Sequence, residues 1–234
     1  MMEFTFLMPC LNEEAALPFC IDEIQSAIHR LHLSAEILVA DNGSVDRSVE
    51  VAQNCGARVV HVAQRGYGAA LIGGIKAAHG KYIIMGDCDG SYDFAHPDGF
   101  VEQLRSGAAL GVGDRFTGGI APGAMPWSHK WGVPLLSALG RWRFHTHVQD
   151  FHCGLRAFDR NAALALNLQC PGMEFSTEII ARFAQSGAPI AQIPTPLRKD
   201  KRPGKPHLRT LRDGLRHLNY ILWKSCMNKR RKQL

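Results

Sequence analysis

Three carboxylates lie within seven residues in the stretch GDCDGSYD, residues 86–93. Asp87 and Asp89 follow the apolar run KYIIM and are one residue apart, so in an extended chain both side chains point to the same side. Two neighbouring negative charges are costly unless a cation lies between them. Mg²⁺ and Mn²⁺ take oxygen ligands and share substrate phosphates, so the pair predicts a site for a metal and a diphosphate. A solvated turn or helix cap is the alternative, and it is the favoured interpretation of Asp93.

A second acidic loop, ADNGSVD, occupies residues 40–46. Asp41 falls at the end of an apolar run, where a carboxylate can accept hydrogen bonds from ribose hydroxyls or from a base N–H. Gly43 would form a tight turn, and Asp46 would cap the helix that follows. Ordinary turn chemistry explains the same residues, so this loop supports nucleotide binding only in combination with others.

The elements that must position these loops alternate along the first half of the chain. Short apolar runs that lack a period of two, each followed by an amphipathic stretch, predict a parallel sheet covered on both faces. Strands are expected at residues 4–8, 36–40, 58–62, 82–85 and 109–113, and helices near 16–30, 46–54, 68–78 and 97–105. The fold class is therefore a doubly wound, mostly parallel α/β sheet flanked by helices. Ligands of such sheets bind beyond the carboxyl ends of the strands, where both acidic loops fall.

The second half of the chain has a different composition. Residues 118–149 are rich in Gly and Pro and hold three of the four Trp residues, which favours a mobile acceptor-side loop with a helix near 134–140. Helices near 159–168 and 176–186 and a strand in PIAQIP, residues 189–194, are expected to follow.

Composition indicates one globular domain. The 234 residues are 46% hydrophobic and 21% charged, and no run approaches the roughly 18 apolar residues that span a membrane. The start MMEFTFLMPCLNEE has no basic flank, so it is typical of a first strand and not of a signal peptide. The seven cysteines form no CxxC pair, which favours reduced thiols and a cytoplasmic protein.

Charge is distributed unevenly along the chain. Residues 198–234 hold 13 of the 27 basic residues and two of the 21 acidic ones, a net charge of +11, whereas the rest carries −5. This basic C-terminal arm predicts a polyanionic partner: phosphate, an anionic membrane surface or nucleic acid. A solvated charge run is the alternative. Nucleic-acid binding is disfavoured because the arm lacks interleaved aromatic residues.

Eight motifs, in order, resemble the family 2 glycosyltransferases of the GT-A fold. The resemblance is strongest to the branch that makes polyprenyl-phosphate sugars, which includes dolichyl-phosphate mannosyltransferase and bacterial polyprenyl-phosphate glycosyltransferases. The motifs are PCLNEE, ADNGSVD, GYGAALIGGI, GDCDGSYD, GDR, DFHCGLRAF, MEFSTEI and HLRTLRDGLRHL. The resemblance implies a GT-A domain at residues 1–197, with a nucleotide-binding half at about 1–117 and an acceptor half at about 118–197, and then the arm at 198–234.

The resemblance also implies roles for individual residues. Asp87 and Asp89 correspond to the family's Asp-x-Asp motif and would bind Mg²⁺ or Mn²⁺. Arg115 would face the diphosphate. The remaining substrate-binding residues would be Pro9, Asn12, Glu13 and Asp41 around the nucleotide, and Arg198 and Arg202 in the arm. This chain has Asn42 where many relatives carry a second acid, and Ser91 where some carry Gln, so the base and the third metal ligand stay open.

The chemistry of sugar transfer assigns catalytic work to Asp89 and Arg115 and makes Asp150 a further candidate. A nucleoside diphosphate leaves from the anomeric carbon, so a metal at Asp89 and the cation of Arg115 would neutralise its growing charge. A hydroxyl acceptor would need a base, whereas a lipid phosphate is already anionic and needs cationic guidance, which the arm supplies. Asp150 could act as that base, orient the acceptor, or pair with an arginine.

The sequence therefore predicts an inverting, metal-dependent transferase that moves a hexosyl unit from a UDP- or GDP-linked sugar to polyprenyl phosphate. LRHLNYILW and the basic residues after it predict peripheral binding at the cytoplasmic face of a membrane, with or without a separate membrane subunit. The alternatives are a transferase for a glycan or other hydroxyl acceptor and, more remotely, a sugar-nucleotidyltransferase. Metal preference, lipid length and oligomeric state stay open.

Overall fold

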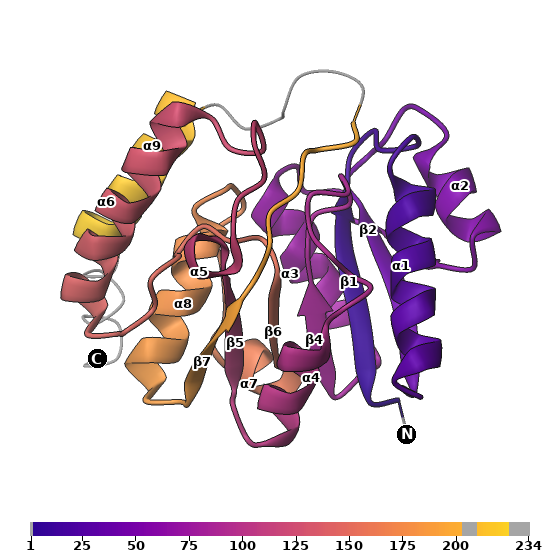
Figure 1. Ribbon diagram of the computed structural model, residues 1–234, viewed down its shortest axis with the longest axis horizontal. Coiled ribbons are helices and arrows are strands. Elements are labelled where there is room, and N and C mark those ends of the chain that lie inside the picture. Colours follow the sequence, from indigo (N-terminus) through magenta and orange to yellow (C-terminus); the bar gives the residue numbers. More distant parts are fainter. Residues whose placement is uncertain (1, 203–209, 225–234) are drawn as a thin grey trace.

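The computed structural model describes residues 2–202 and 210–224 and is built on a seven-stranded sheet (Figure 1). The strand order is β3-β2-β1-β4-β6-β5-β7. Apolar side chains pack on both faces of the sheet, because the strands alternate buried residues between two core clusters: Phe4, Phe6 and Met8 face one, and Leu7 faces the other. The predicted α/β class, with a mostly parallel sheet between helices, is confirmed.

The first half of the chain follows the predicted alternation closely. Its four strands pair in parallel, and Cys10 at the end of the first lies opposite Asp41 at the end of the second. The strands are β1 (Phe4–Cys10), β2 (Ala35–Asp41), β3 (Arg58–His61) and β4 (Tyr82–Met85), and the helices are α1 (Leu17–Arg30), α2 (Ser48–Asn54), α3 (Tyr67–Ala77) and α4 (Asp98–Arg105). The loops after β1, β2 and β4 therefore meet at one edge of the sheet.

The second half departs from a purely parallel sheet. The strands β5 (Leu110–Asp114) and β7 (Ile190–Pro194) were expected and pair in parallel, but β6 (Arg156–Asp159) lies antiparallel between β4 and β5. The helix expected near residues 159–168 is α7 (Arg160–Ala165), which the Asp159 side chain caps, but the strand before it was not expected. The four residues RAFD carry a charge in their short run, and their pairing comes from the sheet and not from local pattern.

Arg156 shows how the antiparallel strand is held. Its side chain is fully buried and donates hydrogen bonds to the backbone carbonyls of Phe151 (2.8 Å), Cys153 (2.9 Å) and Ser176 (2.7 Å). A buried guanidinium is tolerated because carbonyl oxygens accept its N–H groups. This contact ties the loop before β6 to the start of α8 (Phe175–Ser186).

The segment expected to be a mobile loop with a short helix is instead mostly helical. After the single turn α5 (Arg115–Gly118), helix α6 runs over 18 residues (Trp127–Phe144) with Pro134 inside it. The helix near 134–140 was therefore predicted too short. Tertiary packing offsets the poor helix propensity of Gly and Pro, because Gly140 lets the helix approach the ring of Phe151 and Phe144 stacks on the same ring.

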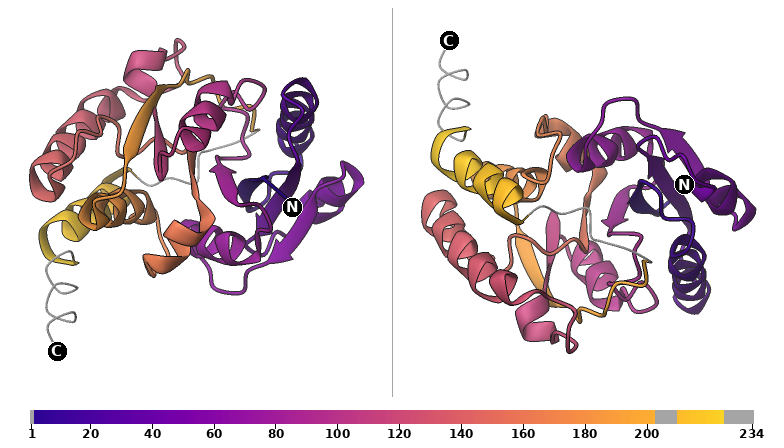
Figure 2. Two further views of the ribbon diagram at one scale, coloured as in Figure 1. Left: turned by 90° about the horizontal axis from the view of Figure 1, so that it is seen from below. Right: turned by 90° about the horizontal axis from the view of Figure 1, so that it is seen from above.

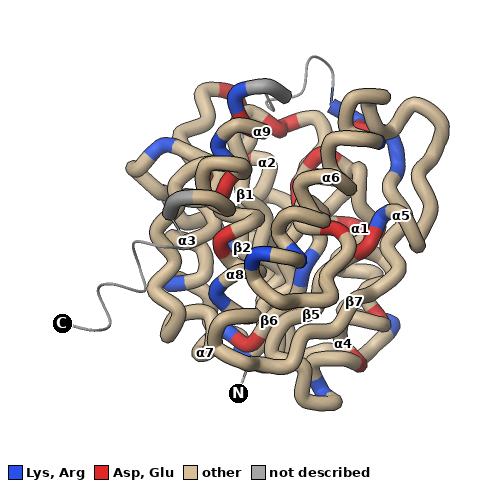
Figure 3. The backbone as a smooth tube through the Cα atoms, turned by 90° about the vertical axis from the view of Figure 1, so that its left-hand side faces the viewer, with Lys and Arg blue, Asp and Glu red and all other residues tan. Residues whose placement is uncertain are grey.

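Part of the basic arm forms one further helix. Helix α9 (Thr210–Asn219) and the π-helical turn η1 (Tyr220–Lys224) contact α6, and both views of Figure 2 show α9 alongside it. Figure 3 shows this side of the molecule face on. Within residues 2–202 and 210–224, no helix combines the length and the apolar character that a bilayer crossing requires.

Candidate active site

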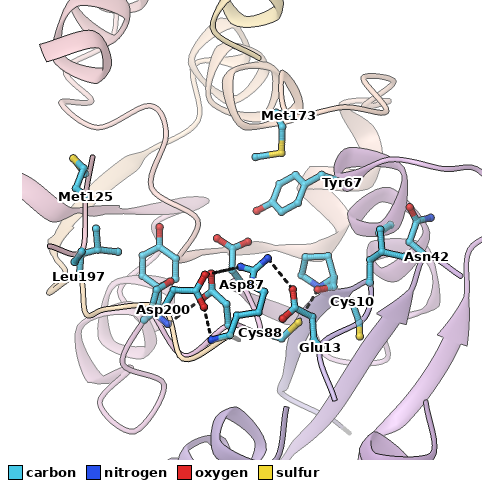
Figure 4. A pocket seen from close by; sticks show the side chains of 18 of the residues that line it. Cys10, Glu13, Asn42, Tyr67, Asp87, Cys88, Met125, Met173, Leu197 and Asp200 are labelled. Atoms are coloured by element: carbon cyan, nitrogen blue, oxygen red, sulfur yellow. Dashed lines mark hydrogen bonds and ion pairs between the residues drawn. The ribbon is translucent and has the colours of Figure 1, made fainter. Parts of the chain in front are cut away.

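A cavity of about 460 Å³ opens beyond the carboxyl ends of β1 and β4 (Figure 4). Six of the predicted site residues line it, and they come from four separate stretches of the chain: Pro9, Glu13, Asp87, Asp89, Arg115 and Arg202. The parallel strands β1 and β4 deliver the first four, because their ends lie side by side. Apolar side chains, among them Met125, Met173 and Leu197, form other parts of the wall.

Asp87 and Asp89 both lie in this cavity, where Asp89 is buried and Asp87 is half-buried. Burial and the neighbouring charge of Asp89 raise the pKa of Asp87 to about 6, against the hydrogen bond from the Tyr67 hydroxyl. Asp89 accepts a hydrogen bond from the Ser91 N–H (2.9 Å) through one oxygen. Gly154 leaves room for the pair, since a Cβ there would lie 2.5 Å from a carboxylate oxygen of Asp87.

Arg202 is the cation that contacts this acidic cluster. Its guanidinium lies 2.8 Å from Asp89, 3.1 Å from Glu13 and 3.1 Å from Asp200. One positive charge therefore faces three carboxylates, with a fourth, Asp87, in the same cavity. The cluster keeps a surplus of negative charge.

The arm is fixed across the pocket by backbone contacts as well. The N–H of Arg198 donates to the carbonyl of Ser91 (2.8 Å), and the N–H of Lys201 donates to the carbonyl of Asp89 (2.8 Å). The Lys201 ammonium lies 3.9 Å from the centre of the Phe19 ring. These contacts hold Arg202 over the carboxylates without depending on its own side chain.

Glu13 is the buried acid of this cluster whose pKa is raised most. Burial, helped by the charge of Asp89 and opposed by Arg202, raises the pKa of Glu13 to about 8. The residue is 5% exposed, and its backbone N–H donates to the Ser48 hydroxyl (2.7 Å). At neutral pH Glu13 therefore tends to hold a proton.

This pKa predicts a pH effect on stability. The pKa of Glu13 in the folded protein lies above its ordinary value of 4.5. The stability that this raised pKa gives the folded state is therefore fully present below pH 4.5 and is lost as pH rises through about 8. We expect a Glu13→Gln variant, without metal or nucleotide, to lose less stability than the wild type across that range, by on the order of a few kcal/mol. Urea unfolding at a series of pH values measures the difference, and parallel curves would contradict it.

Arg115 and Asp150 form a buried pair behind the cavity. The guanidinium donates to both carboxylate oxygens of Asp150, at 2.7 and 2.9 Å, and Asp150 is fully buried. Arg115 lines the cavity, whereas Asp150 does not. Of the roles left open for Asp150, the structure therefore shows the pairing with an arginine, and that arginine is Arg115.

Three predicted substrate-binding residues do not line the cavity: Asn12, Asp41 and Arg198. The Asp41 carboxylate accepts from the N–H groups of Gly43 and Ser44, at 3.1 Å each. Burial alone would raise the pKa of Asp41, but these bonds and those from the Ser44 and His61 side chains hold it below its usual value. Asn12 accepts from the Val45 N–H (2.8 Å), and Arg198 pairs with Glu23 (2.8 Å). In the structure these side chains brace the loops around the pocket.

Several polar residues of the wall were not predicted, among them Asn42, Tyr67, His129 and Asp200. Tyr67 belongs to the GYG motif, and Gly66 before it has φ 130°, a conformation that favours glycine and marks a special turn. Asp200 is the single acid in RKDKR, and its place among four basic residues could have marked it as a candidate site residue. The place of His129, in the first turns of α6, depends on how that helix packs.

The carboxylates fit a divalent cation by number and charge. In the part of the chain that the structure describes, no three His, Cys, Asp or Glu side chains form a set that could enclose a metal. Asp87 and Asp89 instead offer a partial set of oxygen ligands, which suits Mg²⁺ or Mn²⁺ when phosphates and water complete the shell. The surplus negative charge around Arg202 would be balanced by such an ion.

Comparison with known proteins places the chain among sugar-transferring proteins. The family model described as Glycosyl transferase family 2 matches residues 5–165. The low-salt glycan biosynthesis hexosyltransferase Agl6 of Haloferax volcanii is 36% identical over 218 residues, which cover 92% of this chain and 52% of Agl6. This chain thus spans about half the length of that relative. A dolichyl-phosphate hexose transferase of the same organism is 29% identical over 204 residues, 85% of this chain and 86% of that protein.

A solved structure shares the fold. Glucosyl-3-phosphoglycerate synthase from Mycobacterium tuberculosis, crystallised with Mn²⁺, UDP and phosphoglyceric acid, matches with a TM-score of 0.65 and 26% identity. The match covers 86% of this chain and 72% of that one. The mixed sheet and its flanking helices are therefore an architecture found in a protein crystallised with a metal and a nucleotide.

Proposed function

The chain belongs to glycosyl transferase family 2 and has the GT-A fold, and on that premise we propose that it transfers a hexosyl unit, with inversion, from a UDP- or GDP-linked sugar to a polyprenyl phosphate. The observation that carries the proposal is the cavity in which three carboxylates contact Arg202, with Asp87 and Arg115 in the same wall. The similarity to a dolichyl-phosphate hexose transferase supports the lipid acceptor.

On the donor side, Asp87 and Asp89 would bind the metal, and Pro9, Glu13 and Asn42 would contact the nucleotide. A divalent cation held there would neutralise charge on the leaving diphosphate. Arg115 lines the same cavity, and its pairing with Asp150 fixes the position of the guanidinium. We assign Asp150 a positioning role, because it is buried and its two oxygens are occupied by Arg115.

On the acceptor side, the cavity wall supplies charge and apolar surface. An oxygen of the lipid phosphate attacks the anomeric carbon, and the bond from that carbon to the diphosphate oxygen breaks. Because the phosphate is already anionic near neutral pH, no proton must be removed. Arg202 can guide it, and Met125 and Leu197 give the first part of the lipid an apolar contact.

We further propose that the protein acts at the cytoplasmic face of a membrane, where polyprenyl phosphates are embedded, as a peripheral protein with or without a membrane subunit. The net charge of +11 over residues 198–234 supports this location, because anionic lipid attracts such a segment.

Transfer from a panel of labelled UDP- and GDP-sugars tests the function. We expect label to enter the lipid phase when polyprenyl phosphate and Mn²⁺ or Mg²⁺ are present, and chelation of the metal to abolish it. Label on a water-soluble hydroxyl acceptor, with none in lipid, would favour the hydroxyl-acceptor transferase. Pyrophosphate formed from a sugar phosphate and a nucleoside triphosphate would favour the nucleotidyltransferase, and turnover of no nucleotide sugar would refute both transferase assignments.

A further inference from the structure

Helix α6 carries large apolar side chains on its outer surface. Trp127 is 76% exposed, Trp131 68%, Leu135 72% and Trp142 71%. Three of the four Trp residues of the protein thus lie on one helix with most of their surface exposed. Scattered apolar residues on a surface are ordinary, but a contiguous set of this size marks an interaction site.

The exposed side chains form one stripe along the helix. At 3.6 residues per turn, the exposed apolar residues Trp127, Trp131, Pro134, Leu135, Ala138 and Trp142 fall within an arc of roughly 100°. The buried residues Ser137, Gly140 and Phe144 lie on the opposite side. We call the six exposed residues the α6 stripe.

The helix beneath the stripe is firmly seated on the core. A Cβ at Gly140 would lie 2.7 Å from the Phe151 ring, so the helix approaches that ring closely. The Ser137 hydroxyl accepts a hydrogen bond from the Phe151 N–H (3.1 Å). The other side of the helix is fixed by these contacts, so α6 cannot rotate to bury the stripe, and the stripe faces outward.

Basic residues flank the stripe. Helix α6 contains Lys130, Arg141 and Arg143 and no acidic residue. The neighbouring helix α9 adds Leu215, which is 66% exposed, and the exposed Arg212. Figure 3 shows the two helices from this side. Exposed Trp and Leu side chains with Lys and Arg beside them are typical of helices that lie in the interface of an anionic bilayer.

We infer that the α6 stripe and the adjoining surface of α9 form the face that docks on an anionic lipid bilayer. This inference rests on the proposed function and adds to it the surface that meets the lipid. The sequence had pointed to the C-terminal residues for membrane contact, whereas the stripe lies far earlier in the chain.

The stripe is connected to the pocket through the start of α6. Pro126 and His129 line the cavity, and Trp127 lies between them with its side chain exposed. The first turn of the helix thus contacts both the cavity and the proposed lipid surface. A phosphate head group lying in the bilayer surface would meet the pocket entrance without its lipid tail leaving the membrane.

A second copy of the chain suits this surface less well. In a twofold dimer the same patch contacts itself, so Lys130, Arg141 and Arg143 of both copies would come close together. Like charges brought together at an interface oppose association. A bilayer with anionic head groups pairs with these cations instead.

Vesicle sedimentation tests the docking face. We expect the wild type to bind vesicles of phosphatidylcholine with phosphatidylglycerol more tightly than phosphatidylcholine alone, and the double variant Trp131→Ser, Trp142→Ser to bind at least about tenfold more weakly. Val45, 89% exposed in the loop before α2, provides the matched control, and Val45→Ser should bind like the wild type. Equal binding by the double variant would overturn the inference.

Two further readouts separate this inference from the proposed function. Lipids brominated on the acyl chain should quench the fluorescence of the α6 Trp residues, and absence of quenching would overturn the docking face. The double variant should keep transfer to a short, water-soluble prenyl phosphate and lose it to vesicle-embedded polyprenyl phosphate. Loss of both with an unchanged melting temperature would instead place Trp131 and Trp142 in acceptor binding, and a change from dimer to monomer would assign the stripe to a second copy.

Discussion

Replacing Asp89 by asparagine is expected to lower the rate of sugar transfer by about a thousandfold or more. The change removes one of the two carboxylates offered to the metal and so weakens the stabilisation of the leaving diphosphate. It also removes the charge that pairs with Arg202 at 2.8 Å. Initial rates with saturating donor and metal, measured with the donor that the panel identifies, give the fold-change directly.

The structure provides a control for this variant. The amide oxygen introduced by Asp89→Asn would still accept the Ser91 N–H that the carboxylate accepts, so the loop and the melting temperature should change little. Asp93 lies in the same acidic stretch but does not line the cavity, and its carboxylate accepts the Ala95 N–H (3.1 Å). Asp93→Asn should stay within about twofold of the wild-type rate. If both variants lost activity equally, the fold of the loop and not the metal site would be responsible.

Replacing Asp150 by leucine is expected to destabilise the protein by about 3–5 kcal/mol and to reduce transfer at least about a hundredfold. The variant leaves the Arg115 charge, 9% exposed, without its carboxylate partner and without a fixed direction toward the cavity. Urea unfolding gives the change in free energy, and steady-state rates give the loss of transfer. An unchanged KM with a lowered kcat would indicate that the lost contact acts in the transition state.

A double variant separates the two effects. Arg115→Met with Asp150→Leu removes both buried charges, so most of the lost stability should return while transfer stays low. Activity near the wild-type level in the double variant would show that Arg115 has no part in the reaction.

The first half of the fold could be predicted from sequence because its signals are local. Each of its strands is an apolar run followed by an amphipathic helix, and the carboxyl-end rule for parallel sheets then places the acidic loops together. Strand β6 could not be predicted, since Arg156 is charged and its burial depends on two carbonyls just before the strand and one at the start of α8. Helix α6 was predicted too short because Gly and Pro have poor helix propensity, and tertiary packing overrides that propensity.

The site was predictable where residue type alone indicates chemistry. Asp87, Asp89 and Arg115 reach the cavity, but Asp41 has the same residue type and is held by its own loop instead. The partner of Asp150 could not be chosen from sequence, because 35 residues separate it from Arg115 and several other arginines were available. Contacts of this kind are set by the packing of the sheet and not by any local motif.

Arg202 follows β7, the last strand along the chain in the described sheet, and this position has a consequence for synthesis of the protein. A ribosome releases β1, β2 and β4 early, but β7 and Arg202 emerge only after some two hundred residues, and long-range pairing of this kind is slow. Until then, β5 lacks its outer neighbour β7, and the clustered carboxylates lack their guanidinium. Nascent chains therefore carry an open sheet edge that chaperones can recognise, and the contacts of Arg202 with the carboxylates of the cavity form only late in translation.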